Sequence, residues 1–259
     1  MPGTFRAIDL GSYTTSCPAD EATLLMDGSY RADGTRRGVI VCHSAGQRHH
    51  DQTLVEWWPV PRALAESGRF VCLACDFGDP TVETGPTSAR YSWGNDNALL
   101  RMTEAYQFLV GHRVRAKGGP VLLVATSMGA VLALNWSLRY RDQVSGVILA
   151  CPVLDLMTVY CSSGASTFGV GAAYGVRPPV GIPELSSHSP AAYAPQLSGL
   201  PIRIYASHND PIAADAAECQ AFAERVGGGQ VEVIDLGSVG HWPIGTPVDD
   251  AMRFADQFA

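Results

Sequence analysis

Three features that would point away from an ordinary globular domain are missing from this sequence. Basic residues are not in excess: 18 Lys and Arg stand against 25 Asp and Glu, for a formal net charge of −7. A nucleic-acid partner is therefore not expected, because no basic stripe could offset the phosphate charge. No apolar run approaches the length of a membrane span, and no internal repeat is present. These absences favour an ordinary globular domain.

The sequence also lacks a secretory signal and a recognisable disulfide or zinc pattern. No basic region followed by an apolar core opens the chain. The seven cysteines are an odd number, and Cys72-Leu-Ala-Cys75 lies in a strand-like run without the second pair that a zinc site needs. We therefore expect a cytoplasmic protein with reduced thiols, no metal and no cofactor. Pairing of Cys161 with Cys17 or Cys219 stays open, and so does the oligomeric state.

What the sequence does contain is an alternation of strand and helix patterns. This alternation is typical of an α/β fold with a mainly parallel sheet. At 259 residues the chain can bury a large core, so we predict one domain over residues 1–259 that begins with antiparallel strands over 5–36. The expected strands are 38–42, 69–75, 120–126, 144–151, 201–205 and 230–236, of which 38–42 and 144–151 are expected to be buried. The expected helices are 54–67, 95–112, 127–140, 213–226 and 248–258.

Residues 152–200 differ in character from the rest of the chain. Small residues dominate between Cys161 and Gly175, and prolines are frequent afterwards. A loop of this length within a compact domain is usually functional. We expect 152–200 to form a cap or lid, with Tyr160 and Phe168 among the residues that line a pocket.

Ser127 lies between a short apolar strand and a helix rich in small residues. The sequence Ala125-Thr-Ser-Met-Gly129 is close to Gly-x-Ser-x-Gly, the pattern of a sharp strand-to-helix turn that exposes a nucleophilic serine. Small residues are needed on both sides of the serine because the strand and helix backbones nearly touch there, and alanine meets that need at position 125. The alternative interpretation is a buried strand followed by a serine that only caps a helix.

A serine hydroxyl becomes a good nucleophile when a base removes its proton and an acid orients that base. Asp210 and His241 each follow a predicted strand, and loops at the carboxyl edge of a parallel sheet converge. The order Ser, Asp, His also accompanies the elbow motif. We therefore predict Ser127 as nucleophile, His241 as general base and Asp210 as its acid. Asp155, which follows another strand, is the alternative acid.

Acyl transfer also requires two backbone N–H groups at the position where negative charge develops. One donor should be Met128, at the helix N-terminus. The second should come from the turn His43-Ser-Ala-Gly46, with the Ala45 N–H preferred over that of Ser44, while His43 braces the loop. The neighbouring His49-His50-Asp51 is expected to lie near the pocket mouth rather than to bind a metal.

Four segments together resemble the α/β-hydrolase superfamily, and within it the esterase, lipase and acylglycerol-hydrolase-like branch. They are the His43–Gly46 turn, the Ala125–Gly129 elbow, Asn209-Asp210-Pro211 and Gly240-His241-Trp242. The resemblance implies an eight-stranded, mostly parallel sheet flanked by helices, with a cap over the acyl pocket. It also implies a catalytic triad of Ser127, His241 and Asp210 that hydrolyses carboxylic esters. The Gly-, Ser- and Ala-rich cap suggests short-to-medium acyl groups, and we expect His43 and Trp242 among the substrate-binding residues. Two positions depart from the pattern, Ala125 and Ser44, which both stand where the family usually has glycine.

Several activities remain compatible with this set of residues. Thioesterases, acyltransferases, amidases and C–C bond hydrolases use the same machinery, whereas dehalogenases and epoxide hydrolases need an aspartate at the elbow. A hydrolase-like binding or structural protein without turnover is the alternative from another class.

Overall fold

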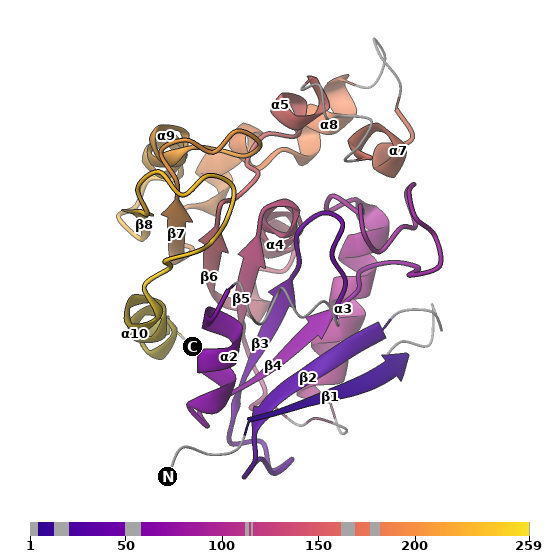
Figure 1. Cartoon of the computed structure of the whole chain (residues 1–259), viewed down its shortest axis with the longest axis vertical. Coiled ribbons are helices and arrows are strands. Elements are labelled where there is room, and N and C mark those ends of the chain that lie inside the picture. Colours follow the sequence, from indigo (N-terminus) through magenta and orange to yellow (C-terminus); the bar gives the residue numbers. More distant parts are fainter. Residues whose placement is uncertain are drawn as a thin grey trace.

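The computed structural model describes residues 5–12, 21–49, 58–111, 114, 116–161, 169–176 and 182–258. Its strands are β1 (Phe5–Ser12), β2 (Glu21–Asp27), β3 (Arg37–Cys42), β4 (Phe70–Cys75), β5 (Val121–Thr126), β6 (Val144–Ala150), β7 (Ile202–Ala206) and β8 (Val231–Asp235). They form one sheet in the order β1-β2-β4-β3-β5-β6-β7-β8 (Figure 1). β2 pairs antiparallel with β1 and β4, and every later pairing is parallel. The predicted fold class is therefore confirmed.

Helices cover both faces of this sheet. One face carries α2 (Val60–Glu66) and α10 (Val248–Phe258), and the other carries α3 (Asp96–Val110), α4 (Met128–Arg139) and α9 (Ala216–Val226) (Figure 1). Along β3 the side chains of Val39 and Val41 join the core under α2, and those of Ile40 and Cys42 join the core under α3. Neither face of these strands is exposed to solvent, which explains their continuous apolar sequences.

Local chemistry explains where two of the predicted helices begin. α2 begins at Val60, because Pro59 is its N-cap and Pro61 lies in the first turn, where a missing N–H costs no hydrogen bond. Of the predicted helix 54–67, residues 58 and 59 thus precede the helix, and 54–57 lie outside the described residues. α9 begins at Ala216, since Asp215 accepts from the Glu218 N–H while the Glu218 side chain accepts from the Asp215 N–H. This reciprocal capping box ends the preceding loop at Asp215.

The described part of 152–200 contains α5 (Leu156–Cys161), α7 (Val170–Tyr174), α8 (Ile182–His188) and the 3₁₀ turns η2 (Pro190–Ala192) and η3 (Ala194–Leu197). The three helices lie beyond the carboxyl ends of β5 and β6 (Figure 1). Val159 of α5 and Val170 of α7 belong to a separate buried apolar cluster with Trp93 and Met128. The segment is thus packed against the helix that follows the elbow.

The described cysteines are all free thiols. Only Cys161 among them is exposed, and Cys17, its possible partner, lies outside the described residues. No described helix combines the length and the apolar character that crossing a membrane requires.

Candidate active site

Ser127 occupies a strained turn between β5 and α4. Its backbone has φ 49° and ψ −117°, and a positive φ is costly for a residue with a side chain. The turn is tight because Gly129 lies directly against β3: a Cβ there would be 2.7 Å from the carbonyl carbon of Cys42 and 2.9 Å from its Cβ. Ala125 is fully buried where β5 pairs with β3 and β6. The structure thus accommodates alanine at the first motif position and requires glycine at the second.

The structure brings Ser127, His241 and Asp210 into one hydrogen-bonded row. His241 Nε2 is 2.8 Å from Ser127 Oγ, and His241 Nδ1 is 2.8 and 2.9 Å from the two carboxylate oxygens of Asp210. A carboxylate only accepts hydrogen bonds, so Nδ1 carries the proton of the neutral ring and Nε2 presents its lone pair to the serine hydroxyl. This is the arrangement in which an imidazole can remove the serine proton.

The Asp210 carboxylate is held by its own loop as well as by His241. Its side chain is fully buried, and it accepts hydrogen bonds from the N–H groups of Ile212 (2.9 Å) and Ala213 (2.8 Å). Burial raises the pKa of the Asp210 carboxyl, but the hydrogen bond and charge of His241 and the two N–H groups outweigh burial and hold the pKa below its usual range. Asp210 is therefore a fixed negative charge behind the imidazole.

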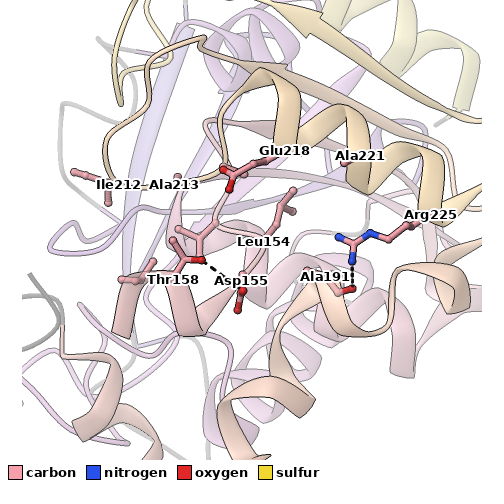
Figure 2. A pocket seen from close by; sticks show the side chains of 12 residues that line it. Leu154, Asp155, Thr158, Ala191, Ile212, Ala213, Glu218, Ala221 and Arg225 are labelled. Carbon is pink, nitrogen blue, oxygen red and sulfur yellow. Dashed lines mark hydrogen bonds between the residues drawn. The ribbon is translucent and has the colours of Figure 1, made fainter. Parts of the chain in front are cut away.

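The alternative acid, Asp155, lies elsewhere. Its carboxylate accepts from the Met157 N–H (2.8 Å) and from Ser189 Oγ (3.2 Å). It faces a hollow of about 230 Å³ between α5 and α9, where Figure 2 shows it across from Glu218. The structure thus places Asp210, and not Asp155, beside His241.

A larger cavity of about 510 Å³ opens at Ser127 and His241. It is lined by Ser44, Ala45, Gly46, Gln47, Trp58, Trp93, Thr126, Ser127, Pro211, Ile212, Gly240, His241, Trp242 and Pro243. Trp58 and Trp93 are buried wall residues, whereas Trp242 is half exposed. No local sequence pattern identifies Gln47 as a lining residue.

Two other residues predicted to bind substrate, His43 and Tyr160, are not among the described residues that line this cavity. His43 is buried behind the loop, where its Nδ1 lies 2.8 Å from the Ser44 carbonyl oxygen. Tyr160 lies in α5, with its ring next to Gly171 and its hydroxyl buried. Phe168 lies outside the described residues. The bracing role expected of His43 therefore fits its position better than contact with substrate.

The loop after β3 is tied down along its length. Ser44 Oγ is 2.7 Å from Thr126 Oγ1, and the Gly46 N–H donates to the Arg90 carbonyl (2.9 Å). The Ser44 N–H points to Gln47 Oε1 at 3.3 Å. Of the two N–H groups predicted in this loop, that of Ala45 is bonded to no described residue, which leaves it available at the cavity wall.

The structure corrects the prediction for His49. This residue is buried, not at the pocket mouth, and its Nδ1 is 3.1 Å from the carboxylate of Asp76. Asp76 directly follows the strand β4. His50 and Asp51 lie outside the described residues. Within the described ranges, no three His, Cys, Asp or Glu side chains are arranged to hold a metal ion.

Comparisons with known proteins agree with this architecture. Residues 89–172 match the family described as "Serine aminopeptidase, S33". No curated protein sequence gives a significant match.

Solved structures give a likeness over the whole chain. An S-formylglutathione hydrolase from Agrobacterium tumefaciens superposes with a TM-score of 0.70 at 13% identity, covering 100% of this chain and 96% of that one. Esterase B from Lactobacillus rhamnosis gives a TM-score of 0.69 at 16% identity, with 100% and 86% covered. A prolyl endopeptidase gives 0.66 at 13% identity; it covers 98% of this chain, which spans only 38% of that longer protein. The sheet order, the elbow and these likenesses together show that the chain has the α/β-hydrolase fold.

Proposed function

We propose that this protein is a serine hydrolase that cleaves carboxylic esters of short-to-medium acyl groups through an acyl-enzyme at Ser127. The observation that carries the proposal is the unbroken hydrogen-bonded row from Ser127 through His241 to Asp210 at the wall of a cavity. The two esterase-like structural neighbours, an S-formylglutathione hydrolase and esterase B, support the same class of reaction.

In the first half of the reaction, Ser127 Oγ attacks the ester carbonyl carbon while His241 Nε2 takes the hydroxyl proton. The Asp210 carboxylate stabilises the imidazolium that forms and keeps the ring in place. When the tetrahedral intermediate collapses, the bond to the alcohol oxygen breaks and His241 returns its proton to that oxygen. The alcohol leaves, and the acyl group remains on Ser127.

In the second half, water takes the place of the alcohol. His241 removes a proton from the water as its oxygen attacks the acyl carbon, and then protonates Ser127 Oγ as the acid is released. In both halves the negative oxygen is held by the N–H groups of Met128 and Ala45. Met128 is the first residue of α4, where backbone N–H groups have no partner within the helix and the helix dipole favours negative charge.

The dimensions of the cavity support a small substrate. About 510 Å³ is within the range of small-molecule pockets, and the indole walls of Trp58 and Trp93 offer apolar contact to an acyl chain. We propose that residues 152–200 act as a cap over this pocket, because α5 and α7 share an apolar cluster with Trp93 and Met128. Trp242, half exposed in the lining, is the proposed contact at the entrance.

Amide hydrolysis is the second candidate, and one observation favours it. Residues 89–172, which include the elbow and all of α5, match a family of serine aminopeptidases. Esters and amides pass through the same acyl-enzyme, so the choice depends on the leaving group and the pocket rather than on the triad.

The test is a parallel assay of p-nitrophenyl esters of graded acyl length and of aminoacyl p-nitroanilides. We expect ester turnover with an optimum at short or medium chains, complete loss in Ser127→Ala, and retention in Ser137→Ala. Ser137 is a matched control, since it lies in α4 and its hydroxyl donates only to the Ala133 carbonyl. Turnover of the anilides with little ester activity would favour the amidase, and full ester activity in Ser127→Ala would overturn both.

A further inference from the structure

A buried ionisable cluster behind the loop 43–49 has no part in the proposed reaction. Asp76 directly follows β4 and is completely buried. His43 and His49, which stand at the two ends of the loop, are 1% and 3% exposed and both approach its carboxylate. Burying three ionisable side chains together costs desolvation free energy unless they form hydrogen bonds or ion pairs with one another. A structural or functional role would explain why the cluster is present.

The Asp76 carboxylate contacts both ends of the loop. Asp76 Oδ1 accepts from the His49 N–H at 2.7 Å, and its Oδ2 is 3.1 Å from His49 Nδ1. His43 Nε2 is 4.0 Å from Oδ1, and the other ring nitrogen of His43 lies 2.8 Å from the Ser44 carbonyl oxygen. His43 also stacks on Phe77, with ring centroids 6.2 Å apart. One carboxylate therefore reaches the loop at its beginning and at its end.

Asp76 is held in its charged form. Burial raises the pKa of its carboxyl, but the hydrogen bond from His49, the charges of His43 and His49 and the His49 N–H outweigh burial and keep the pKa below its usual range. A neutral side chain at this position could not attract both imidazoles equally. The charge is thus part of the anchor.

We propose that Asp76 is a positioning residue for the hydrolysis: through His43 and His49 it fixes the loop 43–49 so that the Ala45 N–H faces the oxygen that becomes negative at Ser127. The inference rests on the proposed function. No described residue accepts a hydrogen bond from the Ala45 N–H, whereas the neighbouring Ser44 and Gly46 are bonded to Thr126 and Arg90.

The expected effect follows from what an oxyanion donor contributes. Loss of one such donor lowers kcat by roughly 100- to 1,000-fold, and a displaced donor loses part of that. We therefore expect Asp76→Asn to lower kcat about 10- to 100-fold and to leave KM within about twofold, because the donor acts mainly on the transition state.

The experiment compares Asp76→Asn, His49→Leu and His49→Asn with the wild type. The amide of Asn can offer a donor near the position of His49 Nδ1, whereas Leu cannot. Asp27→Asn is the matched control: Asp27 is a buried carboxylate at the end of β2, paired with Arg36 away from the cavity. Each variant is assayed on an ester and on the thionoester of the same acid, with thermal unfolding measured in parallel.

A sulfur atom is larger than oxygen and accepts hydrogen bonds weakly, so a thionoester gains little from a well-placed donor. The proposal predicts that Asp76→Asn and His49→Leu lose the preference for the oxygen ester about 10-fold or more, that His49→Asn recovers much of it, and that Asp27→Asn keeps it. Equal losses on both substrates, or wild-type kinetics in a folded variant, would overturn it. Should Asp76→Asn not fold, the two His49 variants decide. A wild type that hydrolyses no ester would instead refute the proposed function itself.

Discussion

Substitution of Gly129 by alanine tests the geometry on which the whole site depends. The added Cβ would lie 2.7 Å from the carbonyl carbon of Cys42. Non-bonded carbon atoms rest at ~3.5 Å or more, so β3 and the start of α4 must part by about 0.8 Å. No flexible side chain can move to relieve this clash, because the contact is with backbone atoms of β3. It acts at once on Ser127, two residues before, and on the loop that leaves β3 at His43.

Two magnitudes follow from this displacement. Overpacking of a well-packed interior costs about 1–3 kcal/mol of stability, which would lower the thermal midpoint by a few degrees in a chain of this size. A misplacement of about 1 Å at a reacting group can cost on the order of 100-fold in rate. We therefore expect Gly129→Ala to remain folded while kcat falls by about two orders of magnitude.

The assay is ester turnover together with a thermal melt, and two variants serve as controls. Gly146→Ala places its Cβ 3.3 Å from the Phe254 ring edge, a side chain that can yield, so activity should persist. Ala125→Gly restores the usual motif and should keep its activity while losing about 0.5–1 kcal/mol of stability, because glycine is unfavourable in a strand. Wild-type kcat in Gly129→Ala would refute the reasoning on backbone contact at the elbow.

Three further outcomes are expected. Asp210→Asn should lower kcat on the order of 1,000- to 10,000-fold, whereas Asp155→Asn should stay within a few-fold; the reverse would reassign the acid. Iodoacetamide at pH 8 should label the exposed Cys161 in the folded protein but not Cys151. Burial and the nearby Asp210 charge raise the pKa of the Cys151 thiol to about 12. Peptide mass spectrometry that finds Cys151 alkylated would contradict its burial. Asp76 and Asp210 have pKa values lowered by folding, so their stabilisation is fully present above the unfolded-state pKa of ~3.9 and lost as the pH falls through the folded-state values. Urea unfolding between pH 5 and 3 should show the free energy of unfolding falling by up to ~1.4 kcal/mol per pH unit for each carboxylate. If Asp76→Asn shows the same pH dependence as the wild type, Asp76 does not contribute to it.

The order of elements and the row of Ser127, Asp210 and His241 could be predicted because each follows from a local rule. Buried parallel strands are recognised in the sequence as short apolar runs. Their carboxyl ends lie at one edge of the sheet, so the residues that follow them converge. This rule favours Asp210 without excluding Asp155 as the acid, since β6 and β7 are neighbours and both aspartates follow a strand. The choice between them depends on loop conformation, namely on the Ile212 and Ala213 N–H groups that hold the Asp210 carboxylate beside the imidazole.

The position of His49 shows why the rest could not be predicted. Its burial depends on Asp76, which lies 27 residues away in the sequence, and no local pattern links the two. A histidine in a polar loop ordinarily faces water, so the expected place was the pocket mouth. The predicted helix 54–67 is wrong at residues 58 and 59 for a different reason, because apolar periodicity does not reveal that Pro59 is the N-cap of the helix rather than a residue within it.

The most direct measurement of the central claim is labelling of the folded protein with a fluorophosphonate, which reacts only with a serine activated by its neighbours. The account predicts one adduct per chain, located at Ser127 by peptide mass spectrometry, absent from Ser127→Ala and strongly slowed in His241→Ala. A folded wild-type protein that forms no adduct, or an adduct on another serine, would contradict the claim that the row from Ser127 to Asp210 is a working catalytic site.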